Sequence, residues 1–77
     1  MGNKDDNSYF QNKEIKMNRL KKERLLLGLK QRELAKQVGC SELDISKFET
    51  ERKTPNYELK KRFAELFKIP TYEIFNQ

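Results

Sequence analysis

The chain has 77 residues, a single cysteine, no histidine and a formal net charge of +5, so one domain with a small core is expected. No apolar run is long enough to cross a membrane, and one cysteine cannot form an internal disulfide, so we expect a protein of the reducing cytoplasm. The sequence also lacks a Cys–His pair, a metal-ligand cluster and a glycine-rich phosphate loop, which argues against an enzyme, a metal site and a bound cofactor.

Residues 1–16 form a polar N-terminal extension rich in Asn, Asp and Lys, and the first seven are expected to be disordered. Ser8 and Gln11 have the Ser-x-x-Gln spacing of a capping box. A helix either begins there and continues past Met17, or it begins only near Asn18. The sequence leaves both possibilities open.

The charge differs between the two ends of the chain. Residues 1–17 have three basic and three acidic side chains, whereas residues 18–77 have fourteen basic and nine acidic ones. An excess of this size suits a polyanionic partner, but many solvated helical surfaces share it. Charge alone therefore does not decide in favour of nucleic acid.

The next helix is predicted over about Asn18–Leu27 and ends at Gly28. The spacing of its apolar residues places Leu20 and Leu27 on the inward face, with Arg24 between them.

Two short helices joined by a tight turn follow, over about Gln31–Val38 and Glu42–Thr50. Gly39 supplies the left-handed backbone that a sharp helix end needs, and Ser41 can cap the second helix. Cys40 is expected to fill a small buried slot in the turn, with redox sensing as the alternative. The apolar positions at helical spacing are Leu34, Ala35 and Val38 in one helix and Ile45 and Phe48 in the other. This is the helix-turn-helix arrangement, whose second helix usually lies in the DNA major groove.

A loop over residues 51–56, fixed by Pro55, leads to a helix predicted over Tyr57–Phe67. Its basic run, Lys60–Arg62, is expected to form a solvated outer face. Thr71 can cap a short final helix. The side chains expected to pack inward are Leu59, Phe63, Ala64 and Phe67 in the first of these helices and Ile74 and Phe75 in the second. The predicted fold class is all-α, a compact bundle of five short helices.

A set of residues in fixed order carries a resemblance over the segment Leu20–Phe75. They are Leu20, Arg24, Gly28, Leu29, Gln31, Leu34, Ala35, Gly39, Ser41, Ile45, Ser46, Glu49, Pro55, Phe63, Ala64, Phe67 and Ile69. In this set the chain resembles the phage-repressor family of helix-turn-helix DNA-binding domains, also called Cro-like or xenobiotic-response-element type. The resemblance implies a lambda-repressor-like bundle in which residues 17–77 form the DNA-binding domain.

The resemblance also implies a set of DNA contacts. The first turn and outward face of the helix after Gly39 would meet base edges, through Ser41, Glu42, Leu43, Ser46 and Lys47. Phosphate contacts would come from the start of the preceding helix and from the loop after the recognition helix, through Gln31, Lys30, Arg52, Lys53 and Asn56. For Gln31, the open alternative is that it caps its helix or is merely solvated.

Arg24 and Glu49 resemble the family's partly buried ion pair, which would fix the recognition helix against the body of the domain. The chain departs from the family in two ways. First, Glu42, Asp44 and Glu49 oppose a single lysine on the recognition helix, and this excess of negative charge would weaken binding near phosphates. The helix dipole by itself favours the carboxylates of Glu42 and Asp44, because both lie near the N-terminus of the helix. The loop also has Glu51 where the family usually has a glycine.

The function expected from this reading is sequence-specific binding of double-stranded DNA by a small transcriptional repressor without a cofactor. A homodimer, at least on DNA, would raise specificity. The self-contact would come from Tyr72, Ile74 and Phe75, or from Tyr9 and Phe10. The alternative is a protein-interaction module with the same fold, such as an antitoxin or anti-repressor subunit, which an acidic recognition helix and an exposed Leu43 would favour.

Overall fold

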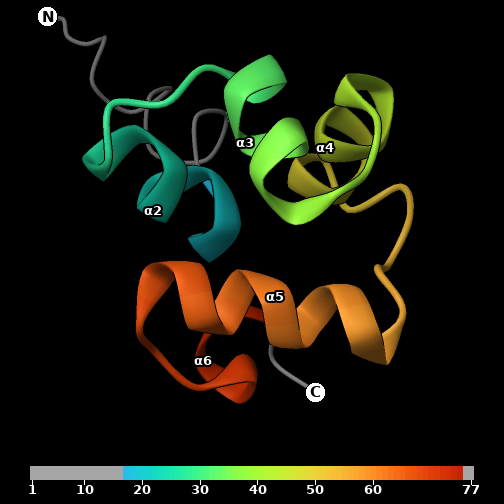
Figure 1. Cartoon of the computed structure of the whole chain (residues 1–77). Coiled ribbons are helices and arrows are strands. Elements are labelled where there is room, and N and C mark those ends of the chain that lie inside the picture. Colours follow the sequence, from blue (N-terminus) through green and yellow to red (C-terminus); the bar gives the residue numbers. More distant parts are fainter. Residues whose placement is uncertain (1–16, 76–77) are drawn as a thin grey trace, which may run out of the picture.

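The computed structural model describes residues 17–75, and within that range the chain forms helices and no strand (Figure 1). The helices are α2 (Arg19–Leu26), α3 (Gln31–Val38), α4 (Glu42–Glu49), α5 (Tyr57–Phe67) and α6 (Thr71–Phe75). The predicted all-α bundle of five helices is confirmed. The expectations for residues 1–16, including the capping box at Ser8 and the roles of Tyr9 and Phe10, lie outside the described residues.

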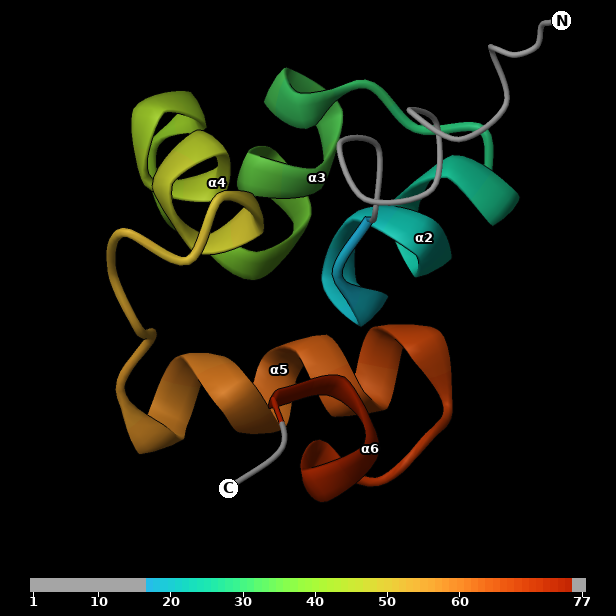
Figure 2. The same ribbon diagram turned by 180° about the vertical axis from the view of Figure 1, so that it is seen from behind.

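The helices are arranged around one small core. Figures 1 and 2 show α5 crossing one side of the bundle with α6 beside it, while α2, α3 and α4 lie opposite α5. Phe63, which is fully buried, is central to this core. Its ring centroid lies 6.2 Å from that of Phe48, 6.1 Å from that of Phe67 and 5.6 Å from that of Phe75. The buried apolar residues are Leu20, Leu34, Ala35, Val38, Ile45, Phe48, Phe63, Phe67 and Ile74.

Short polar side chains begin three of the helices. The side-chain oxygens of Asn18, Ser41 and Asn56 each accept a hydrogen bond from a first-turn backbone N–H, at 3.0, 3.0 and 2.9 Å, which is the expected N-cap geometry. Lysine has no acceptor, so Lys30 cannot cap α3 in this way. Instead, the Glu33 carboxylate accepts the Lys30 backbone N–H at 2.7 Å.

Left-handed residues mark the sharp turns. Gly39 has a φ of 84° and ends α3, as predicted. Glu51 and Lys68 both have a φ of 62°, although neither is glycine. The loop after α4 therefore keeps a left-handed residue at the position where the resembling family has glycine, with a side chain that is poorly suited to it.

The inward position predicted for Leu27 is wrong, because that side chain is 49 % exposed. The last helical residue of α2 is Leu26, and the chain turns away through Leu27 and Gly28 before it completes another turn. The half-buried Leu29 packs against the core instead. Smaller differences occur at two helix ends: Thr50 lies one residue beyond α4, and Thr71 is the first residue of α6 rather than its cap.

Arg24 and Glu49 form a buried ion pair that joins α2 to α4. Arg24 Nε lies 2.6 Å from Glu49 Oε2, and Arg24 Nη2 lies 3.2 Å from Glu49 Oε1. The side chains are 8 % and 2 % exposed. Arg24 Nη1 donates to the Leu29 carbonyl at 2.8 Å, and Gln31 Nε2 donates to Glu49 Oε1 at 3.0 Å. This cluster of Arg24, Gln31 and Glu49, hereafter the Glu49 cluster, connects α2, α3 and α4.

Replacing Arg24 with alanine tests the Glu49 cluster. We expect Arg24→Ala to lower the free energy of unfolding by about 3–5 kcal/mol, because Glu49 would keep a buried charge without its cationic partner. Thermal and urea unfolding, followed by circular dichroism, measure this loss. Arg32→Ala, on the exposed side of α3, is the matched control and should change stability by no more than about 0.5 kcal/mol. Equal stability of the two variants would contradict a stabilising role for the buried pair.

Replacing Glu51 with glycine tests the strained turn after α4. A left-handed backbone costs a residue with a Cβ about 1–2 kcal/mol, and the greater freedom of glycine in the unfolded chain offsets part of the gain. Glu51→Gly should therefore raise the free energy of unfolding by roughly 0.5–1 kcal/mol. Glu51→Ala, which removes the charge but keeps the strain, should show no such gain. A glycine variant that is less stable than the alanine variant would argue against strain at this position.

Candidate nucleic-acid interface

One face of α4 is directed away from the core. Ile45, Phe48 and Glu49 are buried on its inner side. Residues four apart are neighbours on a helix surface, so Glu42 lies beside Ser46 and Leu43 beside Lys47. These two pairs are the predicted base-contacting residues on the side of α4 away from the core. Glu42 and Leu43 are exposed, with 63 % of Leu43 open to solvent, and Ser46 and Lys47 are half-buried. Ser41, the fifth predicted base contact, is exposed at the start of the helix and also caps it.

Ion pairs change the charge that α4 presents. The Glu49 carboxylate is buried against Arg24, and Asp44 Oδ1 lies 3.0 Å from Lys53 Nζ in the following loop. The hydrogen bond from Lys53 lowers the pKa of the Asp44 carboxyl below its ordinary value. The outward face is therefore left with Glu42 against Lys47. The acidic balance read from the sequence does not apply to the surface itself.

Two of the predicted phosphate-contacting residues lie at opposite ends of α4. Gln31 is held beside its C-terminal end through Glu49, and Lys53 is held beside its first turn through Asp44. The Gln31 amide still has a second N–H, because the amide nitrogen carries two donors. The Lys53 ammonium group is engaged by a carboxylate and would have to exchange it for a phosphate.

The other three predicted phosphate contacts are exposed. The Arg52 backbone N–H donates to the Lys47 carbonyl at 2.9 Å, which holds this loop against α4. The guanidinium group of Arg52 has no ion pair within residues 17–75. Lys30 is exposed at the start of α3, where Glu33 already supplies a negative charge. Asn56 uses its side-chain oxygen to cap α5, so only its NH₂ group can donate to a phosphate.

Two long-range hydrogen bonds that hold the motif were not predicted from the sequence. Asn18 Nδ2 donates to the Phe48 carbonyl at 3.0 Å, across 30 residues. Arg62 Nη1 donates to the Val38 carbonyl at the end of α3 at 3.1 Å, so it is not simply part of a solvated face. The Asn18 side chain is recognisable as a helix cap in the sequence. Neither of the long-range acceptors could be identified without the fold.

Cys40 is half-buried and packs against the core rather than being fully enclosed. Burial, with a smaller contribution from the Asp44 charge, raises the pKa of its thiol. A thiol that remains protonated is a weak nucleophile, which favours packing over redox sensing for this residue.

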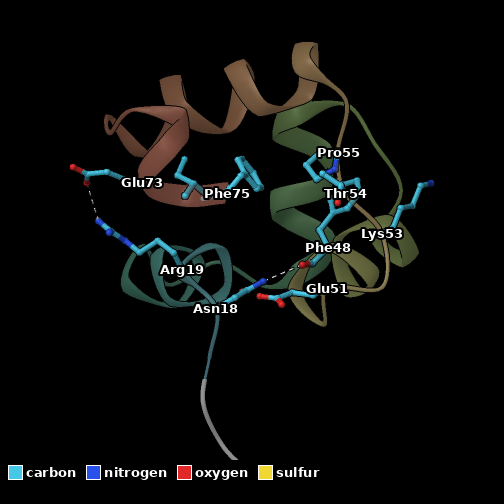
Figure 3. A pocket seen from close by; sticks show the side chains of 10 residues that line it. Asn18, Arg19, Phe48, Glu51, Lys53, Thr54, Pro55, Glu73 and Phe75 are labelled. Atoms are coloured by element: carbon cyan, nitrogen blue, oxygen red, sulfur yellow. Dashed lines mark hydrogen bonds and ion pairs between the residues drawn. The ribbon is translucent and has the colours of Figure 1, made fainter. Parts of the chain in front are cut away.

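A half-open cavity of about 570 Å³ lies beside the motif, between the start of α2, the loop after α4, and α6 (Figure 3). Apolar side chains line it together with the charged residues Arg19, Glu51, Lys53 and Glu73, and Figure 3 shows the Lys53 side chain directed away from the cavity. Arg19 Nη2 lies 3.8 Å from Glu73 Oε1 across one side of the cavity. The lining residues are Asn18, Arg19, Phe48, Glu51, Lys53, Thr54, Pro55, Glu73, Ile74 and Phe75.

Within residues 17–75, no group of His, Cys, Asp or Glu side chains is arranged to hold a metal ion. No helix of that same range is long and apolar enough to cross a membrane.

Comparison with known proteins identifies the family. A family model described as a helix-turn-helix domain matches residues 17–77. No significant match was found among curated proteins or among solved structures. The matched range includes the whole described structure, with the turn at Gly39 and the outward face of α4. The chain therefore belongs to the helix-turn-helix domain family, in agreement with the phage-repressor resemblance of its sequence.

Proposed function

We propose that this domain binds double-stranded DNA in a sequence-specific manner and acts as a small transcriptional repressor of the cytoplasm. The observation that carries the proposal is the outward face of α4, which is open to solvent while the Glu49 cluster fixes the helix from behind. An α-helix with its side chains is about 10–12 Å across, and the major groove of B-DNA is about 12 Å wide. The helix can therefore enter the groove without any rearrangement of the bundle.

Each outward residue of α4 has a defined role in this proposal. Lys47 donates to guanine O6 or N7, Leu43 contacts a thymine methyl group, and Glu42 accepts from cytosine N4. The hydroxyl groups of Ser41 and Ser46 hydrogen-bond to base edges or to a nearby phosphate. This face carries one positive and one negative charge, so its net charge is zero. Most of the electrostatic attraction to the duplex therefore comes from the residues on either side of α4, and the α4 side chains contact the base edges.

The flanking residues position the domain on the backbone. Lys30 and Gln31 meet a phosphate at the start of α3, where the exposed N–H groups and the helix dipole attract an anion. Arg52, Lys53 and Asn56 meet the backbone on the other side of α4. Such contacts fix the register of the protein without reading the sequence.

We also propose a homodimer on DNA. A two-fold pair would read two half-sites about one helical turn apart. Ile74 is buried and Phe75 packs against the core, so Tyr72, which is 64 % exposed on α6, is the best placed of the three C-terminal candidates for self-contact.

A second candidate function is a protein-interaction module, such as an antitoxin or anti-repressor subunit. The exposure of Leu43 and the absence of net charge on the outward face of α4 favour it. In this reading the same face of α4 would contact a protein instead of a base edge.

Binding to duplex DNA at two salt concentrations separates the two functions. With three flanking cations per monomer, Lys30, Arg52 and Lys53, the logarithm of the affinity should fall with a slope of about −2.7, or roughly 40-fold per monomer between 50 and 200 mM salt. Fluorescence anisotropy with a labelled duplex, chosen by selection from a random library, measures this slope.

Two variants locate the contacts. Arg52→Ala should weaken binding to all duplexes alike and reduce the slope by about one, whereas Lys61→Ala, on the exposed side of α5, should change neither. If no duplex binds even at low salt, the DNA-binding proposal fails and the protein-interaction module is favoured.

The pair of Asp44 and Lys53 gives a further prediction. Asp44→Asn removes a negative charge from the edge of α4 and frees the Lys53 ammonium group for a phosphate. Affinity for DNA should therefore increase several-fold, while the salt slope should stay at about −2.7, because Lys53 is already counted among the three flanking cations. Glu65→Gln, which removes an exposed charge from α5, is the control and should have little effect. Unchanged or weaker binding by Asp44→Asn would mean that Lys53 does not contact the backbone.

A further inference from the structure

Three consecutive leucines at the end of α2 are open to solvent. Leu25, Leu26 and Leu27 are 47 %, 71 % and 49 % exposed. The buried residues of α2 are Leu20 and Arg24, so the leucines lie outside the contacts that hold this helix in the bundle. Single exposed leucines are ordinary on a protein surface, but a contiguous apolar patch marks an interaction site or an aggregation risk. These three neighbouring side chains, hereafter the leucine ridge, expose apolar surface around the end of α2.

The backbone of the leucine ridge is held in place by the end of the helix. The Leu27 N–H lies 3.2 Å from both the Glu23 and Arg24 carbonyls, and the Gly28 N–H donates to the Leu25 carbonyl at 3.0 Å. The Arg24 side chain, fixed by the Glu49 cluster, also binds the carbonyl of the following turn. A ridge that is already ordered loses little conformational entropy when a partner binds.

The charges next to the leucine ridge are positive. Lys21 and Lys22 lie one helical turn before Leu25 and Leu26, and residues four apart are neighbours on a helix surface. The acidic residue of the same turn, Glu23, is already paired with Arg19 at 2.7 Å. The edge of the ridge therefore offers two cationic groups to a partner.

We propose that the leucine ridge docks onto an acidic amphipathic helix of a partner protein, whose leucine-like face covers the ridge while its carboxylates meet Lys21 and Lys22. The charges disfavour a second copy of this chain, because a two-fold contact would bring lysines against lysines. They suit an anionic lipid surface, but an apolar face one turn long is too short for an interfacial helix.

The position of the leucine ridge makes this contact compatible with DNA binding. Figures 1 and 2 both place the C-terminal end of α2 on the side of the molecule away from α4. A partner on the ridge leaves the outward face of α4 free. The inference therefore goes beyond the proposed function, and neither depends on the other.

The test is an NMR titration of the full 77-residue ¹⁵N-labelled chain with two synthetic helical peptides. Both have leucines along one face, and the edges of that face carry glutamates in one peptide and lysines in the other. The glutamate peptide should shift the amide signals of Leu25, Leu26 and Leu27 and bind roughly tenfold more tightly than the lysine peptide, the size expected for two exposed charge pairs.

Leu26→Ser should abolish these shifts, and Lys22→Glu should remove the preference for glutamate. Tyr57→Ser, which removes an exposed apolar side chain from α5, is the matched control and should bind like the unchanged chain.

Four outcomes overturn the proposal. The first is no shift at the ridge with the glutamate peptide, and the second is equal binding of both peptides. The third is a ridge whose signals move with protein concentration or on deletion of residues 1–16, because a second copy or the chain's own N-terminal segment would then occupy it. The fourth is binding to vesicles of anionic lipid without binding to the peptide. None of these measurements involves DNA, so a failure here is distinguishable from a failure of the proposed function.

Discussion

The buried carboxylate of Glu49 is the interaction on which the arrangement of this domain depends. A carboxylate removed from water is strongly destabilising unless its oxygens are hydrogen-bonded and its charge is paired. Glu49 accepts two hydrogen bonds from Arg24 and one from Gln31, and Arg24 in turn holds the Leu29 carbonyl. The core of such a short chain is small, and apolar packing is non-directional. The Glu49 cluster adds direction, because its hydrogen bonds fit one orientation of α4 relative to α2 and α3.

The same cluster connects the fold to the chemistry of the surface. By pairing Glu49 internally, it removes one negative charge from α4, and Lys53 compensates a second at Asp44. The outward face then carries hydroxyl groups, one leucine and one charge of each sign, which is a varied set of donors, acceptors and apolar groups. Gln31 belongs both to the cluster and to the proposed phosphate contacts, so the residue that would meet the backbone is bound to the residue that orients α4.

Features that depend on neighbours in the chain could be predicted from the sequence. The bounds of α3 and α5, the cap at Ser41 and the left-handed turn at Gly39 follow from spacing, capping and glycine chemistry. The pairing of Asp44 with Lys53 and the hydrogen bonds of Asn18 and Arg62 could not, since they join residues 9, 30 and 24 positions apart. Leu27 was misplaced because periodicity assumes that the helix continues, whereas α2 ends one residue earlier. The family resemblance pointed to Arg24 and Glu49, but their bonds to Leu29 and Gln31 required the fold.

The most direct test of this account is an experimental structure of the domain on a duplex selected from a random library. The account predicts α4 in the major groove with Leu43 and Lys47 against base edges. The forked pair of Arg24 and Glu49 should have the same geometry as in the free protein, at 2.6 and 3.2 Å. A complex in which α4 faces solvent, or in which Glu49 leaves Arg24 when DNA binds, would contradict the claim that the buried pair holds the recognition helix ready for the duplex.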